Sequence, residues 1–340
     1  MAKKSKESSG DILKDLEAKY GVGRADVKEL TIVSTGSIQF NKAMKIGGTA
    51  LGKMYEIFGA ESSGKTTCTL HQIAEYQKAF PNKKVALIDF EYTFSPEYAE
   101  SIGVDVDNLL IYQPTTMEEG YDLTIELVRN EIISLVVIDS QTAAAPKATL
   151  EGEMGDSTMA LQARINSKFC LKIRGLLAIH KCSLIFVSQL RDNIGSMSSE
   201  GSVTTGGKAI KFYSDVRWKI WKINDKDHEL NKTTIDVVKN KLGKPFGKAV
   251  INILWGIGFD RIGEMIDYAV EFGFIKRGGA GWLTIGEYKA QGNEKMKELF
   301  MEHPEVYEQL EKDVMNELNN VEEVEEEIVE LNNEQDADSN

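Results

Sequence analysis

Short apolar runs alternate with amphipathic segments through the first two thirds of the chain. Near-continuous apolar runs are typical of strands buried in a parallel sheet, and apolar positions at i, i+3 and i+4 are typical of helices. The pattern predicts strands at 54–58, 84–89, 108–112, 134–139 and 183–187, and helices at 65–79, 117–130 and 160–180. We therefore expect an α/β fold with a mostly parallel sheet flanked by helices.

The pattern changes toward both ends of the chain and predicts four regions. A short amphipathic helix at 11–20 lies within an N-terminal helix and linker (1–33), and the sheet-forming core follows (34–262). The chain then turns mostly helical in a small C-terminal domain (263–320) and ends in a disordered acidic tail (321–340).

Two segments interrupt the alternation inside the core. Residues 151–159 are small or polar without periodicity, and residues 192–207 contain four Gly and four Ser. Segments of this composition are typical of surface loops, so both are predicted to be mobile.

Charge is distributed unevenly along the chain, so the net charge alone does not decide whether the protein binds a polyanion. The 340 residues carry a formal net charge of −13, which by itself argues against a polyanionic partner. Residues 321–340, however, contain nine Asp or Glu and no Lys or Arg, whereas residues 208–248 hold eleven basic and five acidic residues. A nucleic-acid partner is therefore not excluded. The lack of a long apolar stretch or an apolar signal core predicts a cytoplasmic protein with no membrane partner.

A glycine-rich loop follows the first predicted strand of the core and opens the first long helix. Residues 59–66 read GAESSGKT and fit the pattern G-x-x-x-x-G-K-[ST] of phosphate-binding loops. Gly59 and Gly64 permit the backbone N–H groups to face phosphate oxygens, Lys65 supplies a positive charge, and Thr66 can ligate Mg²⁺. The alternative is a glycine turn with a solvated lysine, but the flanking strand and helix favour binding of a nucleoside triphosphate.

Polar residues at the ends of three predicted strands are candidates for the chemistry, because ligands gather at the carboxyl ends of parallel strands. Asp139 is either a partner of Mg²⁺ or a helix cap. Glu91 and Asp89 are equal candidates to orient or deprotonate an attacking water. Gln189 either hydrogen-bonds the γ-phosphate or is a satisfied polar residue at a strand end.

Five motifs together carry a specific resemblance. They read STGS at 34–37, AESSGKTT at 60–67, EGEMGDS at 151–157, TTGG at 204–207 with KFY at 211–213, and VVKNK at 237–241. From about residue 11 to about residue 318 the chain resembles the bacterial RecA recombinase family. The resemblance implies a RecA-type P-loop ATPase core with a small N-terminal helical element and a small α+β C-terminal domain. It also implies a DNA-dependent ATPase that forms filaments on single-stranded DNA and pairs it with homologous double-stranded DNA.

The resemblance assigns roles to residues of the nucleotide site. Glu91, rather than Asp89, matches the catalytic glutamate. Gln189 is grouped with the catalytic residues on the ground of its place at a strand end. Lys239 and Lys241 match the lysines that reach the ATP of the neighbouring subunit. The residues implied to bind ATP are Gly59, Glu61, Ser62, Ser63, Gly64, Lys65, Thr66, Thr67 and the adenine-stacking Tyr98, with Thr66 and Asp139 at Mg²⁺.

The two predicted loops match the DNA-binding loops of the family, at about 151–164 and 191–208. The DNA-binding residues implied are Met159, Arg164, Ile194, Gly206, Gly207 and Lys208. Family members commonly place a basic residue early in the second loop, where residues 192–207 contain none, and Arg191 is expected to compensate. Phe212 matches the residue that couples the ATP interface to DNA binding, and the helix at 11–20 matches the element that docks on the next protomer. From the residues alone, Met159 is equally well a core residue, and the alternative for the loop from Asp192 is a surface linker.

Two other functions are compatible with the same core. One is a ring-forming helicase or other motor, and the other is a recombination mediator that binds nucleotide without hydrolysing it. The presence of Lys65, Thr66, Glu91 and Asp139 together argues against the mediator. The chain also departs from the family at Ser95 and Ile262, where an aspartate and an aromatic residue are common near the adenine, which predicts looser selection of the base.

Overall fold

The computed structural model describes residues 29–153, 159–192, 202–204, 207–223 and 231–337, together with Lys14, Glu17 and Lys19. The chain divides into two units, Met1–Thr31 and Ile32–Asn340. In the first unit, Lys14, Glu17 and Lys19 are helical, and the rest of the helix predicted at 11–20 lies outside the described residues. The second unit contains the features that follow.

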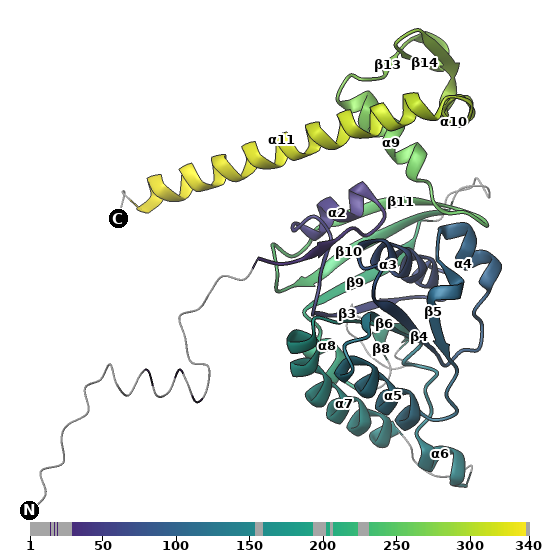
Figure 1. The fold of residues 1–340 in the computed structure, drawn as a ribbon, viewed down its shortest axis with the longest axis vertical. Coiled ribbons are helices and arrows are strands. Elements are labelled where there is room, and N and C mark those ends of the chain that lie inside the picture. Colours follow the sequence, from purple (N-terminus) through teal and green to yellow (C-terminus); the bar gives the residue numbers. More distant parts are fainter. Residues whose placement is uncertain are drawn as a thin grey trace, which may run out of the picture. The chain divides into compact units, whose positions relative to one another are not determined.

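Strands and helices alternate through the second unit as predicted (Figure 1). The strands of the main sheet are β3 (Met54–Gly59), β4 (Lys84–Asp89), β5 (Leu109–Tyr112), β6 (Ile133–Asp139), β7 (Ser183–Asp192), β8 (Ser202–Thr204), β9 (Val216–Lys222), β10 (Asn231–Asn240), β11 (Lys248–Leu254) and β12 (Gly258–Phe259), and β1 (Ile32–Val33) pairs separately with β2 (Thr49–Ala50). The helices of the core are α2 (Ile38–Met44), α3 (Lys65–Ala79), α4 (Pro96–Ile102), η1 (Val106–Asn108), α5 (Met117–Arg129), α6 (Lys147–Glu151), α7 (Met159–His180) and α8 (Ala209–Tyr213).

The main sheet has ten strands among the described residues, in the order β12-β11-β10-β9-β3-β7-β6-β4-β5, with β8 paired to β7. The six strands from β9 to β5 are mutually parallel, and β10, β11 and β12 extend the sheet in antiparallel pairs. The expected fold class, an α/β fold with a mostly parallel sheet flanked by helices, is confirmed. All parallel strands end at one edge of the sheet, so β3, β4, β6 and β7 bring their last residues together.

Two apolar layers cover the faces of this sheet. Alternate residues of each strand point to opposite faces, so Val85 and Leu87 of β4 pack in one core while Ala86 and Ile88 pack in the other. Helices α2, α3 and α4 contribute to the first core, and α5, α7 and α8 to the second, as the ribbon shows (Figure 1). Burial on both faces explains why the strands are nearly continuous apolar runs.

The C-terminal domain has its own core and a small antiparallel sheet. Its elements are α9 (Arg261–Glu271), β13 (Lys276–Arg277), η2 (Gly279–Gly281), β14 (Trp282–Ile285), β15 (Tyr288–Gln291), α10 (Gly292–Glu302) and α11 (Pro304–Ala337). The carboxylate of Glu264 accepts hydrogen bonds from the hydroxyl of Ser37 (2.9 Å) and the main-chain N–H groups of Ile38 (3.0 Å) and Gln39 (2.7 Å). These bonds fasten α9 to the positive end of α2, and burial raises the pKa of Glu264.

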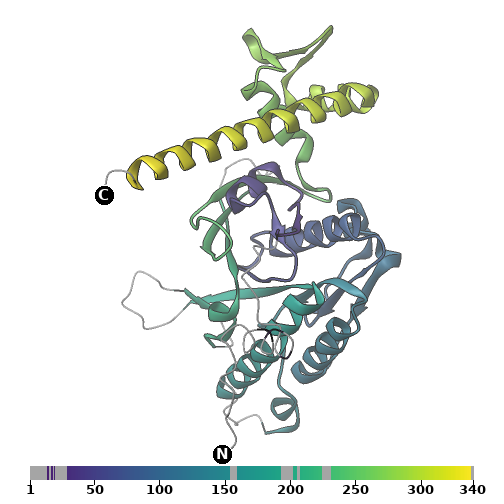
Figure 2. The ribbon, with the colours of Figure 1, turned by 60° about the vertical axis from the view of Figure 1, so that its left-hand side comes forward.

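Two segments differ from the prediction. Strand β7 continues to Asp192 and pairs with β8, so part of the loop predicted at 192–207 is a β-hairpin. Helix α11 is continuous to Ala337 in both views (Figures 1 and 2), so residues 321–337 have a helical backbone and not the disordered one predicted for the tail. Val321, Val324, Ile328 and Leu331 are spaced at helical intervals, a periodicity that the charge of the segment obscured. No helix in the described part of the chain is long and apolar enough to span a membrane.

Candidate active site

The glycine-rich loop connects the end of β3 to the start of α3 and requires glycine at both ends. A Cβ on Gly59 would lie 2.1 Å from the main-chain oxygen of Ile220 in the neighbouring strand β9, closer than real atoms approach. Gly64 has a φ of 95°, in the left-handed region that favours glycine, and a Cβ there would lie 2.7 Å from Ile253. The N-terminus of α3 therefore opens on a loop without obstructing side chains, as an anion site requires.

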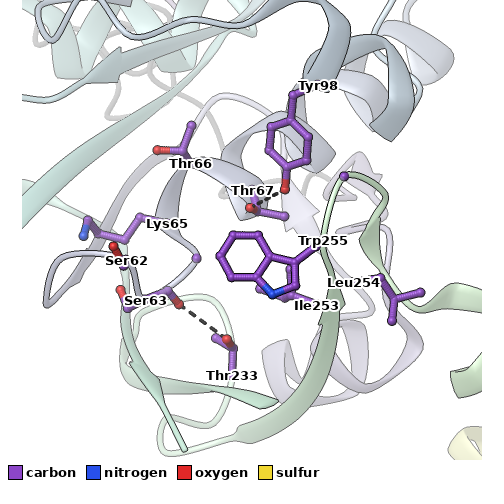
Figure 3. A pocket seen from close by; sticks show the side chains of 12 residues that line it. Ser62, Ser63, Lys65, Thr66, Thr67, Tyr98, Thr233, Ile253, Leu254 and Trp255 are labelled. Atoms are coloured by element: carbon purple, nitrogen blue, oxygen red, sulfur yellow. Dashed lines mark hydrogen bonds between the residues drawn. The ribbon is translucent and has the colours of Figure 1, made fainter. Parts of the chain in front are cut away.

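A cavity of about 410 Å³ lies over this loop. Its walls are formed by Ser62, Ser63, Gly64, Lys65, Thr66, Thr67, Tyr98, Thr233, Ile253, Leu254, Trp255 and Gly256. The ring of Tyr98 and the indole of Trp255 lie on one side of the pocket, away from Lys65 (Figure 3). The pocket thus has a polar end for phosphates and an aromatic end for a base.

The polar end presents donors that suit phosphate oxygens. The Nζ of Lys65 donates to the main-chain oxygens of Ala60 (2.6 Å) and Gly59 (3.3 Å), and burial lowers the pKa of Lys65 against the opposing effect of nearby carboxylates. The buried hydroxyl of Ser63 has no hydrogen-bond partner among the described residues. A buried ammonium and an unpaired hydroxyl both gain from an anion, so these residues fit a nucleotide phosphate.

Thr66 and Asp139 meet beside the loop and fit a magnesium ion shared with the nucleotide. The Thr66 hydroxyl donates to Oδ2 of Asp139 at 3.2 Å. Burial, followed by repulsion from Glu91, raises the pKa of Asp139 to about 7. No group of three or more His, Cys, Asp or Glu in the described residues forms a complete metal site. One hydroxyl and one carboxylate nevertheless suit Mg²⁺, which keeps waters and takes phosphate oxygens as its other ligands.

Glu91 and Asp89 have different environments, although their spacing in the sequence does not separate them. Buried Asp89 accepts hydrogen bonds from the main-chain N–H groups of Glu91 (3.0 Å), Tyr92 (2.9 Å) and Phe94 (3.3 Å), and from the side chain of Gln113 (3.0 Å). Its oxygens hold the turn after β4. Half-buried Glu91 instead accepts one hydrogen bond, of 2.7 Å, from Nε2 of Gln189 at the end of β7.

Lys239 and Lys241 lie on the segment that ends β10, and their ammonium groups contact the chain around α8. Lys239 donates to the main-chain oxygens of Lys211 (2.9 Å) and Phe212 (3.0 Å), and Lys241 lies 3.7 Å from Asp215. Burial lowers the pKa of Lys239 to about 8, helped by the neighbouring charges of Lys241 and Arg217. Neither lysine lines the cavity over the glycine-rich loop.

Four of the predicted DNA-binding residues, Met159, Arg164, Gly207 and Lys208, lie around the first turns of α7 and the start of α8. Arg164 on α7 is exposed, as are Gly207 and Lys208, and Phe212 is 64% exposed. A Cβ on Gly207 would lie 2.7 Å from the Cβ of Ala163, so the end of the second loop touches α7. Met159 is the first residue of α7 and Arg191 lies in β7, while Ile194 and Gly206 lie outside the described residues.

Thr233 and Trp255 also line the pocket, although no sequence pattern marks them as binding residues. Thr233 donates to the main-chain oxygen of Ser63 at 3.5 Å, and Trp255 is 72% exposed after the end of β11. Both lie more than 150 residues from the glycine-rich loop in the sequence, so no local motif connects them to it. An exposed tryptophan next to a glycine at a strand end was the one available signal.

We expect Trp255 to report nucleotide binding. Adding nucleotide should change Trp255 fluorescence, and Trp255→Ala should weaken affinity about 5-fold, because one aromatic contact contributes about 1 kcal/mol. Titration of nucleotide against the protein measures both effects. Trp282→Ala, in the C-terminal domain, is the matched control and should leave affinity unchanged. Equal affinities of the two variants would contradict the assignment.

Comparison with known proteins agrees with this geometry. A model of the RecA N-terminal domain matches residues 11–260, and a model of the RecA C-terminal domain matches residues 263–319. Protein RecA of Chlorobaculum tepidum is 44% identical over 302 residues, which cover 85% of this chain and 86% of the relative. Protein RecA of Mycobacterium marinum is 42% identical over 313 residues (89% and 90%), and that of Streptomyces venezuelae is 40% identical over 316 residues (90% and 83%). The chain belongs to the RecA family.

Proposed function

We propose that this protein hydrolyses ATP with Mg²⁺ to assemble filaments on single-stranded DNA, in which it pairs homologous strands and exchanges them. Membership of the RecA family makes the chain a DNA-dependent ATPase of recombination and repair. One observation supports the mechanism most directly: the Glu91 carboxylate beside the phosphate loop is hydrogen-bonded to Gln189, on the strand that leads into the second DNA-binding loop.

The pocket residues divide the work on the nucleotide. Backbone N–H groups at 62–67 and the Lys65 ammonium bind the phosphates, and Gly59 lets the loop pass close to β9. Tyr98 and Trp255 cover the base, and the negative charge of Glu61 favours the protonated form of Lys65. Thr66 and Asp139 hold Mg²⁺, which when bound neutralises charge on the phosphates. Glu91 orients the attacking water and accepts its proton.

Assembly completes the site, because Lys239 and Lys241 lie outside the pocket of their own protomer. In a filament they contact the ATP of the neighbouring subunit and stabilise the charge that develops on the transferred phosphate. The N-terminal element (1–33) docks on the next protomer. Hydrolysis then depends on filament formation, and ATP at the interfaces favours the extended, DNA-binding state.

DNA binding falls to the two loops of the core at about 151–164 and 191–208. Glycine N–H groups at Gly206 and Gly207 and the charges of Arg164, Arg191 and Lys208 hold the phosphate backbone. Met159 and Ile194 separate bases without reading them, so binding is independent of sequence. Phe212 couples these loops to the ATP interface. The core is followed by the C-terminal domain (263–320) and the acidic segment (321–340), and the protein acts in the cytoplasm.

A strand-exchange assay tests this function. We expect the protein with ATP to exchange single-stranded DNA into a homologous duplex and not into a heterologous one, and electron microscopy with a non-hydrolysable ATP analogue to show helical filaments. Unwinding of both duplexes would indicate a motor. Nucleotide binding without DNA-stimulated hydrolysis would indicate a mediator. Either outcome would contradict the proposal.

A further inference from the structure

Two polar residues near the active site have no role in the function described so far. Thr142 lies in the segment that follows β6 and Asp139, and Gln162 lies in the first turn of α7. Neither lines the nucleotide pocket. Both make hydrogen bonds to main-chain atoms that position other residues, and those bonds connect the DNA-binding region to Glu91.

Gln162 anchors the segment 141–144 to α7. Its Nε2 donates to the main-chain oxygens of Gln141 and Ala144, each at 3.2 Å. Both partners are acceptors, so only the amide N–H groups of Gln162 can face them. The side chain of Gln141 is fully buried and neither of its polar atoms has a hydrogen-bond partner among the described residues. Among the described residues, the segment is held by the two bonds from Gln162, by the main-chain bond from Gln141 to Val187 (2.9 Å), by bonds from the N–H of Ala143 to Ser140 (3.1 and 3.3 Å) and, just beyond it, by the bond from Met117 to Ala145 (2.8 Å). Within this set, Gln162 supplies the link to the first turn of α7.

Thr142 connects the same segment to the end of β7. The main-chain N–H of Gln189 donates to the Oγ1 of Thr142 at 3.0 Å. Strand β6 ends at Asp139, and its pairing with β7 ends before Gln189, so β6 offers no main-chain acceptor to the N–H of Gln189. The hydroxyl oxygen of Thr142 accepts this hydrogen bond instead. The side chain of Gln189 in turn donates to Glu91 at 2.7 Å.

The first turns of α7 lie where both DNA-binding loops end. Gln162 falls within the first loop region, two residues before the exposed Arg164. The end of the second loop touches the same turn, since Gly207 lies against Ala163. If DNA displaces this turn, Gln162 moves with it and shifts segment 141–144, to which it is hydrogen-bonded. Thr142 lies in that segment and holds the main chain of Gln189, so the shift also moves the Gln189 amide that contacts Glu91.

We propose that Thr142 and Gln162 are positioning residues that transmit DNA binding at the first turn of α7 to Glu91 through Gln189. We call Gln162, Thr142 and Gln189 the relay. Without DNA, the relay keeps the Gln189 amide on Glu91, where it occupies an oxygen that the attacking water needs. With DNA, the relay moves and frees Glu91. This inference rests on the proposed function, since it assigns the route by which DNA stimulates hydrolysis.

The test measures ATP turnover with and without single-stranded DNA in full-length variants. Thr142→Val removes the hydroxyl at nearly constant volume, and Gln162→Met removes the amide. In each, the ratio of DNA-stimulated to DNA-free turnover should fall about 5-fold, the effect of one lost hydrogen bond. The KM for ATP should not change, because neither residue contacts the pocket. The double variant should resemble either single variant, because both act on one path.

Matched controls separate this role from a loss of folding. Thr142→Ser keeps the hydroxyl and should keep the wild-type ratio. Thr124→Val and Gln77→Met remove equivalent bonds, to Gly120 (2.7 Å) and Asp105 (2.8 Å), away from the relay. A variant that is merely less folded loses both rates in proportion and keeps its ratio. Thermal unfolding of each variant confirms that it is folded.

The outcomes distinguish the relay from the proposed function. Wild-type protein that DNA does not stimulate would contradict the function itself, and the relay with it. Stimulated wild-type protein, with ratios for Thr142→Val and Gln162→Met equal to those of the controls, would overturn the relay alone. A ratio for Thr142→Ser as low as that for Thr142→Val would also overturn it, because the hydroxyl would then not be the active feature.

Discussion

Glu91→Gln should lower ATP turnover by about 10²-fold or more, the loss expected when a general base is removed. The amide has the shape of the carboxylate but does not accept the proton of the attacking water. Glu91 lies outside the walls of the nucleotide pocket, so affinity for ATP should remain within about 2-fold, since only interactions made in the transition state are lost. Single-turnover hydrolysis measures the first quantity, and nucleotide titration measures the second.

Two control variants make this prediction specific. Glu97→Gln, on the exposed surface of α4, removes a carboxylate that accepts a long hydrogen bond (3.4 Å) from the exposed hydroxyl of Ser95 and that contacts no carboxylate or water site at Glu91, so this variant should hydrolyse ATP at the wild-type rate. Asp89→Asn should instead lower the free energy of unfolding by about 1–3 kcal/mol, because an amide cannot accept all four hydrogen bonds at that turn. Wild-type turnover in Glu91→Gln would refute its role, and a selective loss of turnover in Asp89→Asn would favour the other carboxylate.

Gly59→Ala should disrupt both the fold and the nucleotide site. The added methyl group would lie 2.1 Å from the main-chain oxygen of Ile220, and this atom belongs to a strand at the centre of the sheet that cannot move alone. Either β3 and β9 separate or the loop shifts, and we expect a loss of about 3 kcal/mol in the free energy of unfolding. Affinity for nucleotide should fall as well, because the same shift moves the N–H groups that face the phosphates. Urea unfolding and nucleotide titration measure the two effects.

Gly175→Ala is the matched control for this substitution. Gly175 lies inside α7 with an ordinary helical backbone, and a Cβ there meets no atom within 4 Å. Alanine in a helix should stabilise the protein by about 0.5–1 kcal/mol. If the two variants unfold at the same urea concentration, the close approach of Gly59 to β9 does not control stability.

The sequence predicted strands and loops correctly where all the residues that determine the element are close together in the chain. The apolar runs at 84–89 and 134–139 are strands β4 and β6, because burial on both faces requires such a run. The loop at 59–66 was recognisable because its glycines, lysine and threonine all act within one turn. The tail was predicted less well, since a high density of Glu concealed the helical spacing of its apolar residues.

The relations between distant residues could not be predicted in the same way. Sequence spacing left Asp89 and Glu91 equal, and the structure separates them by their partners: four donors surround Asp89, and Gln189, almost 100 residues away, faces Glu91. Strand β11 runs in the same direction as β3, because β10 is antiparallel to both β11 and β9 and β9 is parallel to β3. Trp255, which follows β11, therefore lies at the same edge of the sheet as the loop that follows β3. No periodicity encodes that neighbourhood.

The sequence by itself therefore determined the α/β core, the phosphate loop and the set of polar residues at the strand ends, since each depends on backbone period and on side chains close in the chain. Only the tertiary structure decided which of those residues meet: Glu91 with Gln189, Lys239 with α8, Thr142 with the end of β7, and Trp255 with the nucleotide pocket. The physical reason is that hydrogen bonds and ring contacts act over a few ångströms. The strand order β11-β10-β9-β3-β7-β6-β4, and not distance along the chain, brings these groups within that range.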